Sequence, residues 1–117
     1  MIKKTYTLSK IINAAAITTV RYKEYDYAII AGGSEGSTVR KDTISVFYNA
    51  KLNSITAYTN TTGLAEGRDT ITATTISVND TDYAVFVGGW ISGTTYSKYI
   101  DVITKTDYDT PPTTVVS

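Results

Sequence analysis

Two short apolar runs, each stopped by a pair of glycines, constrain this chain more than any other feature. Residues 27–31 precede Gly32-Gly33, and residues 83–87 precede Gly88-Gly89. Five apolar residues rich in β-branched and aromatic types are too few for a helix, so each run predicts a strand buried on both faces. Glycines would end such a strand because they adopt backbone angles that other residues resist, and they let a second backbone come close.

The two runs begin 56 residues apart, and the similarity continues on both sides of them. The segment Thr18-Thr19-Val20 matches Thr74-Thr75-Ile76 at this offset, and Ile44-x-Val46 matches Ile100-x-Val102. No insertion is needed to align the two halves. Self-similarity at a fixed period of this size indicates a solenoid, a propeller or an array of repeats.

Apolar alternation and turn residues predict four strands in each repeat unit. In the first unit they cover residues 14–20, 27–31, 43–48 and 54–58, with a polar turn at 21–26 and a loop at 34–42. In the second unit they cover residues 70–78, 83–87, 98–104 and 110–116, with a loop at 90–97. Pro111-Pro112 restricts the last of these to an edge strand, because proline cannot donate to a ladder.

Four strands per unit and a glycine doublet after the second strand resemble the kelch repeat of β-propellers. The matching residues also include Arg68 ahead of the second unit, Tyr27 and Tyr83 in the second strands, and the apolar alternation of the third strands. The chain departs from the kelch pattern where a tryptophan is usual near strand four, since Tyr58 stands there. Ile12 occupies the position that corresponds to Arg68.

The resemblance implies an all-β fold of two four-stranded antiparallel kelch-like blades. Residues 1–13 would be the tail of a preceding blade, 14–58 the first blade, 59–69 a connector and 70–117 the second blade. Two blades cannot close a propeller, which typically needs 4 to 8. We therefore expect three or four chains to assemble into a ring, or further blades on another chain to complete it, and we favour self-assembly.

Composition excludes several classes of function. Eleven basic and eleven acidic residues leave no net charge, so neither nucleic acid nor an anionic membrane is an expected partner. The absence of cysteine and histidine removes disulfides, thiolate chemistry and the usual zinc and copper sites, and no cofactor is expected. No apolar run approaches a membrane span, and the start of the chain is a poor signal peptide. The compartment stays open, with the cytoplasm slightly favoured.

The loops after the second strands and the connector should emerge at one end of the blades. This loop face would gather six candidate ligand-binding residues: Ser34, Glu35, Arg40, Arg68, Trp90 and Tyr96. Exposed aromatic rings beside polar groups suit a protein partner, or alternatively a glycan. Two of the six also have structural interpretations, because Trp90 could pack on a neighbouring blade and Arg68 could brace the blades through carbonyls.

We expect no enzyme activity. A glycan-active hydrolase would need two carboxyl groups facing each other across a cleft, and the sequence nominates no such pair. The glycine-rich segment 31–38 lacks the lysine of a phosphate-binding loop and is followed by no predicted helix.

Overall fold

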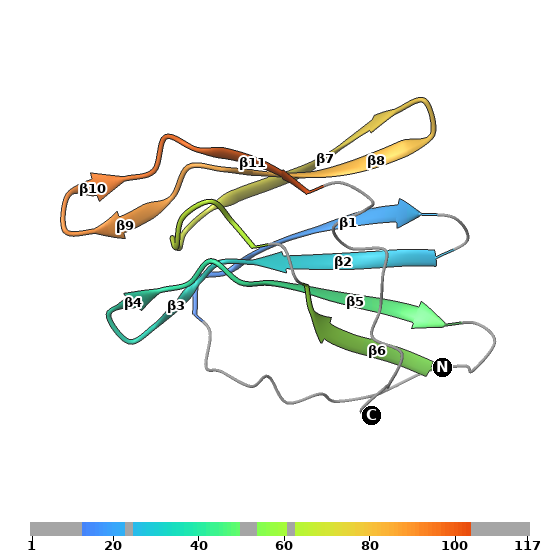
Figure 1. Cartoon of the computed structure of the whole chain (residues 1–117), viewed down its shortest axis with the longest axis horizontal. Helices are drawn as coiled ribbons and strands as arrows, with labels where there is room; N and C mark the ends of the chain where they lie inside the picture. Colours follow the sequence, from blue (N-terminus) through green and yellow to red (C-terminus); the bar gives the residue numbers. More distant parts are fainter. Residues whose placement is uncertain (1–12, 23–24, 50–53, 61–62, 104–117) are drawn as a thin grey trace.

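The computed structural model describes residues 13–22, 25–49, 54–60 and 63–103, and this part of the chain is all-β, as predicted. None of the described residues belongs to a helix that could cross a membrane. Two open antiparallel sheets lie one above the other in Figure 1, and two short hairpins extend from the same end of the pair. The predicted N-terminal tail, apart from residue 13, and the predicted fourth strand of the second unit lie outside the described residues.

The first sheet is a four-stranded meander in the order β1-β2-β5-β6. Its strands are β1 (Ala16–Tyr22), β2 (Tyr25–Ala31), β5 (Thr43–Asn49) and β6 (Ser54–Thr59). The four predicted strands of the first unit are confirmed. The prediction of a polar turn over residues 21–26 is wrong, because Arg21 pairs with Asp26 in the ladder and forms an ion pair of 3.1 Å with its carboxylate.

The second sheet has the order β11-β8-β7. Its strands are β7 (Thr72–Val78), β8 (Thr81–Val87) and β11 (Ile100–Ile103). A two-residue turn of Asn79 and Asp80 joins β7 to β8, and both residues have positive φ, 51° and 65°. Asparagine and aspartate tolerate this conformation better than other non-glycine residues, and the turn that it forms matches the twist of the two strands.

Residues 34–42 and 90–97 were predicted as loops, and this prediction is wrong for part of each segment. They contain the hairpins β3 (Ser34–Glu35) with β4 (Thr38–Val39), and β9 (Trp90–Ser92) with β10 (Thr95–Tyr96). Strands of two or three residues are too short to show alternation in the sequence. Gly36 and Gly93 lie at the two turns with positive φ.

The core lies between the two sheets. β1 packs on β7 and β8, and the buried side chains Val20, Ile29 and Phe86 are at most 2% exposed. The core cluster also contains Ala16, Tyr27, Ala31, Leu64, Ala84 and Ile103. Tyr27 is buried and Tyr83 is half-buried, so the two equivalent tyrosines have different surroundings.

The backbone repeats at the predicted offset of 56 residues. The glycine doublets have nearly the same φ values, 70° and 95° in the first and 67° and 107° in the second. Ala14 and Thr70, which are equivalent positions, are both non-glycine residues with positive φ. The isolated bridge between Asn13 and Ser34 has its counterpart between Asp69 and Trp90.

The third strand departs from this offset, so the prediction of an alignment without insertion is wrong. Ala31 pairs with Thr43, whereas the equivalent Val87 pairs with Ile100, one residue further along the chain. A shift of one residue turns each side chain to the opposite face of a sheet. In the second sheet Asp101 and Ile103 therefore face the core, while Ile100 and Val102 point away from it.

The connector between the units passes against both glycine doublets. A Cβ atom on Gly32 would lie 2.5 Å from the carbonyl oxygen of Arg68, and one on Gly89 would lie 2.5 Å from that of Asp69. The predicted close approach of a second backbone is thus confirmed. Gly33 N donates to Arg68 O at 3.0 Å, and Trp90 N donates to Asp69 O at 2.9 Å, which fixes the connector to both units.

We predict that Gly89→Ala lowers the free energy of unfolding by about 3 kcal/mol, because the new methyl group adds a backbone clash to an unfavourable φ. Gly93→Ala is the matched control: its φ is also positive, but nothing lies within 4 Å of the added carbon. We expect that variant to lose only about 1 kcal/mol. Urea unfolding followed by circular dichroism measures both, and equal losses would refute the proposed close packing.

Candidate interaction surface

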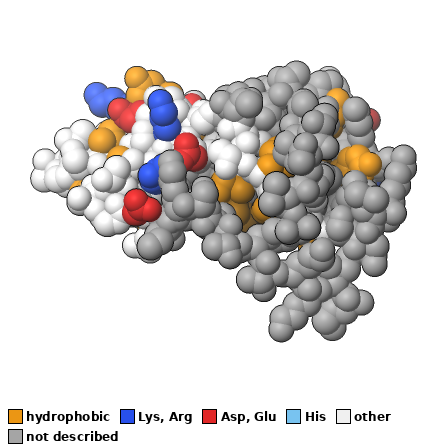
Figure 2. All heavy atoms as spheres, turned by 60° about the horizontal axis from the view of Figure 1, so that its bottom comes forward, with side chains coloured by type: hydrophobic (Ala, Val, Ile, Leu, Met, Phe, Trp, Pro, Cys, Tyr) orange, Lys and Arg blue, Asp and Glu red, His pale blue; other side chains and the backbone are white. Residues whose placement is uncertain are grey.

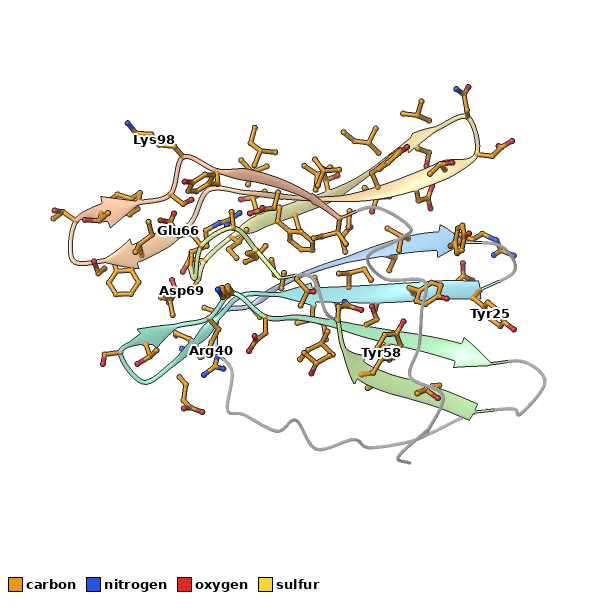
Figure 3. The ribbon with its side chains drawn as sticks, in the orientation of Figure 1. Tyr25, Arg40, Tyr58, Glu66, Asp69 and Lys98 are labelled. Carbon is orange, nitrogen blue, oxygen red and sulfur yellow. The ribbon has the colours of Figure 1, made fainter. Side chains whose placement is uncertain are left out.

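The hairpin end of the molecule brings together segments that are far apart in the sequence. The β3–β4 hairpin follows β2, the β9–β10 hairpin follows β8, and the connector lies between them (Figure 1). Figure 3 places Arg40, Glu66 and Asp69 at this same end, from the first unit and the connector. Figure 2 shows basic and acidic side chains interspersed over this end, without a large patch of one sign.

Of the six residues predicted for this face, Arg68 lies deepest. Its side chain is fully buried, and Nε donates to the carbonyl of Gly88 at 2.6 Å while Nη2 donates to that of Phe86 at 3.3 Å. Nη1 lies 2.8 Å from Asp101 Oδ2, an ion pair in which that oxygen accepts no aligned hydrogen bond. Arg68 therefore braces the second sheet, as its structural interpretation predicted.

The predicted residues of the first unit divide between the interior and the surface. Ser34 is 5% exposed and its backbone is bonded to Asn13, so it belongs to the scaffold. Arg40 is half-buried and its Nη2 donates to Asp42 at 2.9 Å. Glu35 is exposed on β3. This unit thus contributes mainly the tip of its hairpin to the surface.

The second hairpin carries the aromatic part of the surface. Trp90 is half-buried, and its indole Nε1 donates to Gly93 O at 2.8 Å, which fixes the ring over its own hairpin. Tyr96 pairs with Trp90 and is 66% exposed. Trp90 and Tyr96 line a shallow pocket of about 450 Å³, together with Asp69, Thr70 and Gly89.

Asp69 and Thr70 were not among the predicted site residues. Asp69 pairs with Trp90 through two backbone hydrogen bonds, which brings its side chain to the pocket. The signal in the sequence is the match of Asn13 to Asp69 at the repeat offset, a polar residue just before each first strand. Side chains of both units thus reach the hairpin end, but the described residues that line the pocket come from the second unit and the connector.

The glycine-rich segment after β2 does not present its amides to a ligand. Gly32 N donates to Asp42 O, Gly33 N to Arg68 O, and Ser34 N to Asn13 O, at 2.8 to 3.1 Å. A phosphate-binding loop needs several amides directed at the anion. These three are used within the chain.

A second, larger pocket of about 760 Å³ lies between the end of β1 and the β7–β8 turn, at the end of the sheets away from the hairpins. Arg21, Ser77, Asn79, Asp80 and Asp82 line it. Asp82 accepts hydrogen bonds from Arg21 N at 2.7 Å and from the Ser77 hydroxyl, so its carboxylate ties the two sheets together. Within the described residues, no group of three or more His, Cys, Asp or Glu side chains is placed to hold a metal ion.

Comparison of the chain with protein-family models, with curated proteins and with solved structures finds no match in any of the three.

The buried ion pair gives a direct test of this assignment for Arg68. We predict that Arg68→Met lowers the free energy of unfolding by about 3–5 kcal/mol, since it leaves the Asp101 carboxylate and two carbonyls without their partner. Arg21→Met is the control, because Arg21 and Asp26 are 61% and 71% exposed and such a pair contributes less than about 1 kcal/mol. Thermal and urea unfolding measure both, and similar losses would contradict a bracing role.

Proposed function

We propose that this chain is a non-catalytic interaction module made of two kelch-type β-propeller blades, and that it binds a protein partner through its hairpin end. The observation that carries the proposal is the emergence of both hairpins at one end of a packed pair of sheets, with Glu35 and Tyr96 exposed on them. Binding residues are often found on loops that a rigid scaffold positions.

The blade assignment is supported by the order of the strands. The first sheet runs β1-β2-β5-β6, and the second has β7, β8 and β11 in the corresponding order, each with a glycine doublet after its second strand. Up-and-down sheets that pack face to face are the unit of a propeller. The chain has neither the kelch tryptophan near strand four nor an arginine at position 12, so the proposal depends on topology and glycine geometry.

The composition of the hairpin end supports a protein ligand. Tyr96 and Tyr99 are 66% and 52% exposed, and Glu35 and Lys98 add charges of both signs. Protein interfaces obtain most of their binding energy from a few aromatic residues surrounded by a polar rim. This surface combines both features.

We expect Tyr96→Ala to weaken partner binding by at least about tenfold, because exposed tyrosines are frequent interface hot spots. Proteins retained from a lysate of the source cells by immobilised wild-type chain are identified, produced singly and titrated against the wild type and each variant. Asp80→Ala, at the opposite end, is the matched control and should leave the affinity unchanged. If every retained protein binds Tyr96→Ala as well as the wild type, the hairpin end is not the binding surface.

The pocket beside Trp90 favours a glycan as the second candidate ligand. The indole of Trp90 and the phenol of Tyr96 share this pocket with the Asp69 carboxylate. Aromatic rings can receive the apolar face of a sugar, while a carboxylate accepts hydrogen bonds from its hydroxyl groups. A lectin-like module would use this pocket alone.

A glycan array separates the two candidates. Under the lectin-like alternative, the wild type binds a defined set of sugars, and both Asp69→Asn and Tyr96→Ala lose that binding while keeping the β-sheet circular dichroism spectrum. Glu35→Gln, on the other hairpin, serves as the control and should not affect sugar binding. A wild-type chain that binds no glycan at millimolar concentration would rule out this alternative and leave the protein ligand.

A further inference from the structure

The second sheet exposes an apolar face on the side away from the first sheet. Along β7, β8 and β11, the side chains of Ile76, Val87, Ile100 and Val102 are 51%, 39%, 63% and 49% exposed. The ladder places them on one face, since Ile100 pairs with Val87 and Val102 with Val85. The opposite face of these strands buries Ala84, Phe86 and Ile103 against the first sheet. We call the exposed side the outer face of the second sheet. Val85, beside Val102 on this face, is only 8% exposed, and the four exposed side chains lie around it. Exposed apolar side chains grouped on one face mark an interaction site.

The repeat indicates what covers this face. Thr74, Ile76, Val85 and Val87 correspond, at the offset of 56, to Thr18, Val20, Ile29 and Ala31 of the first sheet. In the first sheet these positions face the second sheet, and Val20, Ile29 and Ala31 are at most 2% exposed. The first two strands of each sheet pair in the same register. The outer face of the second sheet is therefore equivalent to a face that the next unit covers within the chain.

Within one chain, the second sheet packs on the first through the side that carries Ala73, Thr75, Ala84 and Phe86. A unit that covers the outer face in the same way must present the residues equivalent to these four. The corresponding residues are Ile17, Thr19, Ala28 and Ile30, on the opposite side of the first sheet. Ile17 is 59% exposed, Thr19 is exposed, and Ala28 and Ile30 are half-buried. This matching surface belongs to the same chain, but a single copy cannot bring its two surfaces together.

The polar contacts between the sheets repeat in the same way. The hydroxyl of Thr18 donates to that of Thr75 at 2.7 Å, since the latter donates to the carbonyl of Thr19. The equivalent pair across two copies is Thr74 of one and Thr19 of the other, and both residues are exposed. Asp82 accepts from Arg21 N, and the equivalent contact would join Asp26 of one copy to Ser77 N of the next.

We propose that the outer face of the second sheet binds the first sheet of a second copy of this chain, by repeating the interface that joins the two sheets within one copy. Such contacts are heterologous: each copy uses one surface to bind and another to be bound, so the assembly grows head to tail until it closes. Closure with three or four copies would give a ring of six or eight sheets. This inference goes beyond the proposed function and does not depend on a partner at the hairpin end.

Two single substitutions and their mixture test the proposal. Ile100→Asp puts a charge on the outer face of the second sheet, and Ile17→Asp puts one on the proposed binding face of the first sheet. The wild type should have the mass of several chains by light scattering, and each variant alone should be a folded monomer. An equimolar mixture should form a dimer only, because one intact surface remains on each variant. Tyr96→Asp on the β9–β10 hairpin is the control and should keep the wild-type mass.

Disulfide trapping gives a second measurement that does not rely on weakening the contact. The chain has no cysteine, so Thr19→Cys and Thr74→Cys each introduce the only thiol. Mixed and oxidised, the two variants should form a covalent dimer in high yield, whereas each alone should form little. The double variant Thr18→Cys with Thr75→Cys is the positive control, since those hydroxyls lie in contact within one chain.

Three results would overturn the proposal. The first is a folded wild-type chain that stays monomeric at 100 μM. The second is an oligomer that Ile17→Asp leaves intact, which would mean that two outer faces bind each other. The third is equal disulfide formation by the mixture and by each single variant. If Tyr96→Ala loses partner or glycan binding but keeps the wild-type mass, that result bears on the proposed function and leaves the proposed assembly standing.

Discussion

The arrangement of the two sheets depends on Arg68, a buried arginine in the connector. Its backbone N–H and carbonyl bond to Arg40 and Gly33 of the first unit, while its guanidinium bonds the carbonyls at the end of β8 and pairs with Asp101. One residue therefore joins the first unit through its backbone to the second through its side chain. A guanidinium suits this place because its fixed fork of donors satisfies several acceptors at once.

The ion pair is also linked to the register of the third strand of the second sheet. The shift of one residue turns Asp101 toward the core, where Arg68 neutralises it, and turns Ile100 and Val102 away from the core. In the first sheet, Thr43 and Ser45 occupy the ladder positions that correspond to Ile100 and Val102. Both are buried and form hydrogen bonds with the side chain of Asn60. The same shift thus places one carboxylate, Asp101, among the apolar residues of the inner side and two aliphatic side chains, Ile100 and Val102, on the outer side.

Much of the fold was predictable, because strands that end at paired glycines and recur at a fixed offset leave few alternatives. The register shift of the third strand was not predictable, because the alternation in Ile100-x-Val102 indicates a strand but not which face of the sheet its apolar residues occupy. The hairpins β3–β4 and β9–β10 were too short to show a period. Of the candidate site, exposed Glu35 and Tyr96 followed from their loop positions. The burial of Ser34 and Arg68 depends on contacts with distant segments, Asn13 and Asp101, which local sequence does not reveal.

The two proposed surfaces differ in chemistry and in position, and this separation has a physical consequence. The hairpin end is polar with a few exposed aromatic residues, whereas the outer face of the second sheet is a row of aliphatic side chains. Head-to-tail contacts through the outer face leave the hairpins of each copy on the same rim, because the strands of successive sheets keep their direction. A ring would then present one hairpin pair per chain, and weak contacts at each pair would combine into strong binding to a partner with repeated sites. The proposed self-association at the outer face would therefore increase the apparent affinity of the hairpin end without any new contact there.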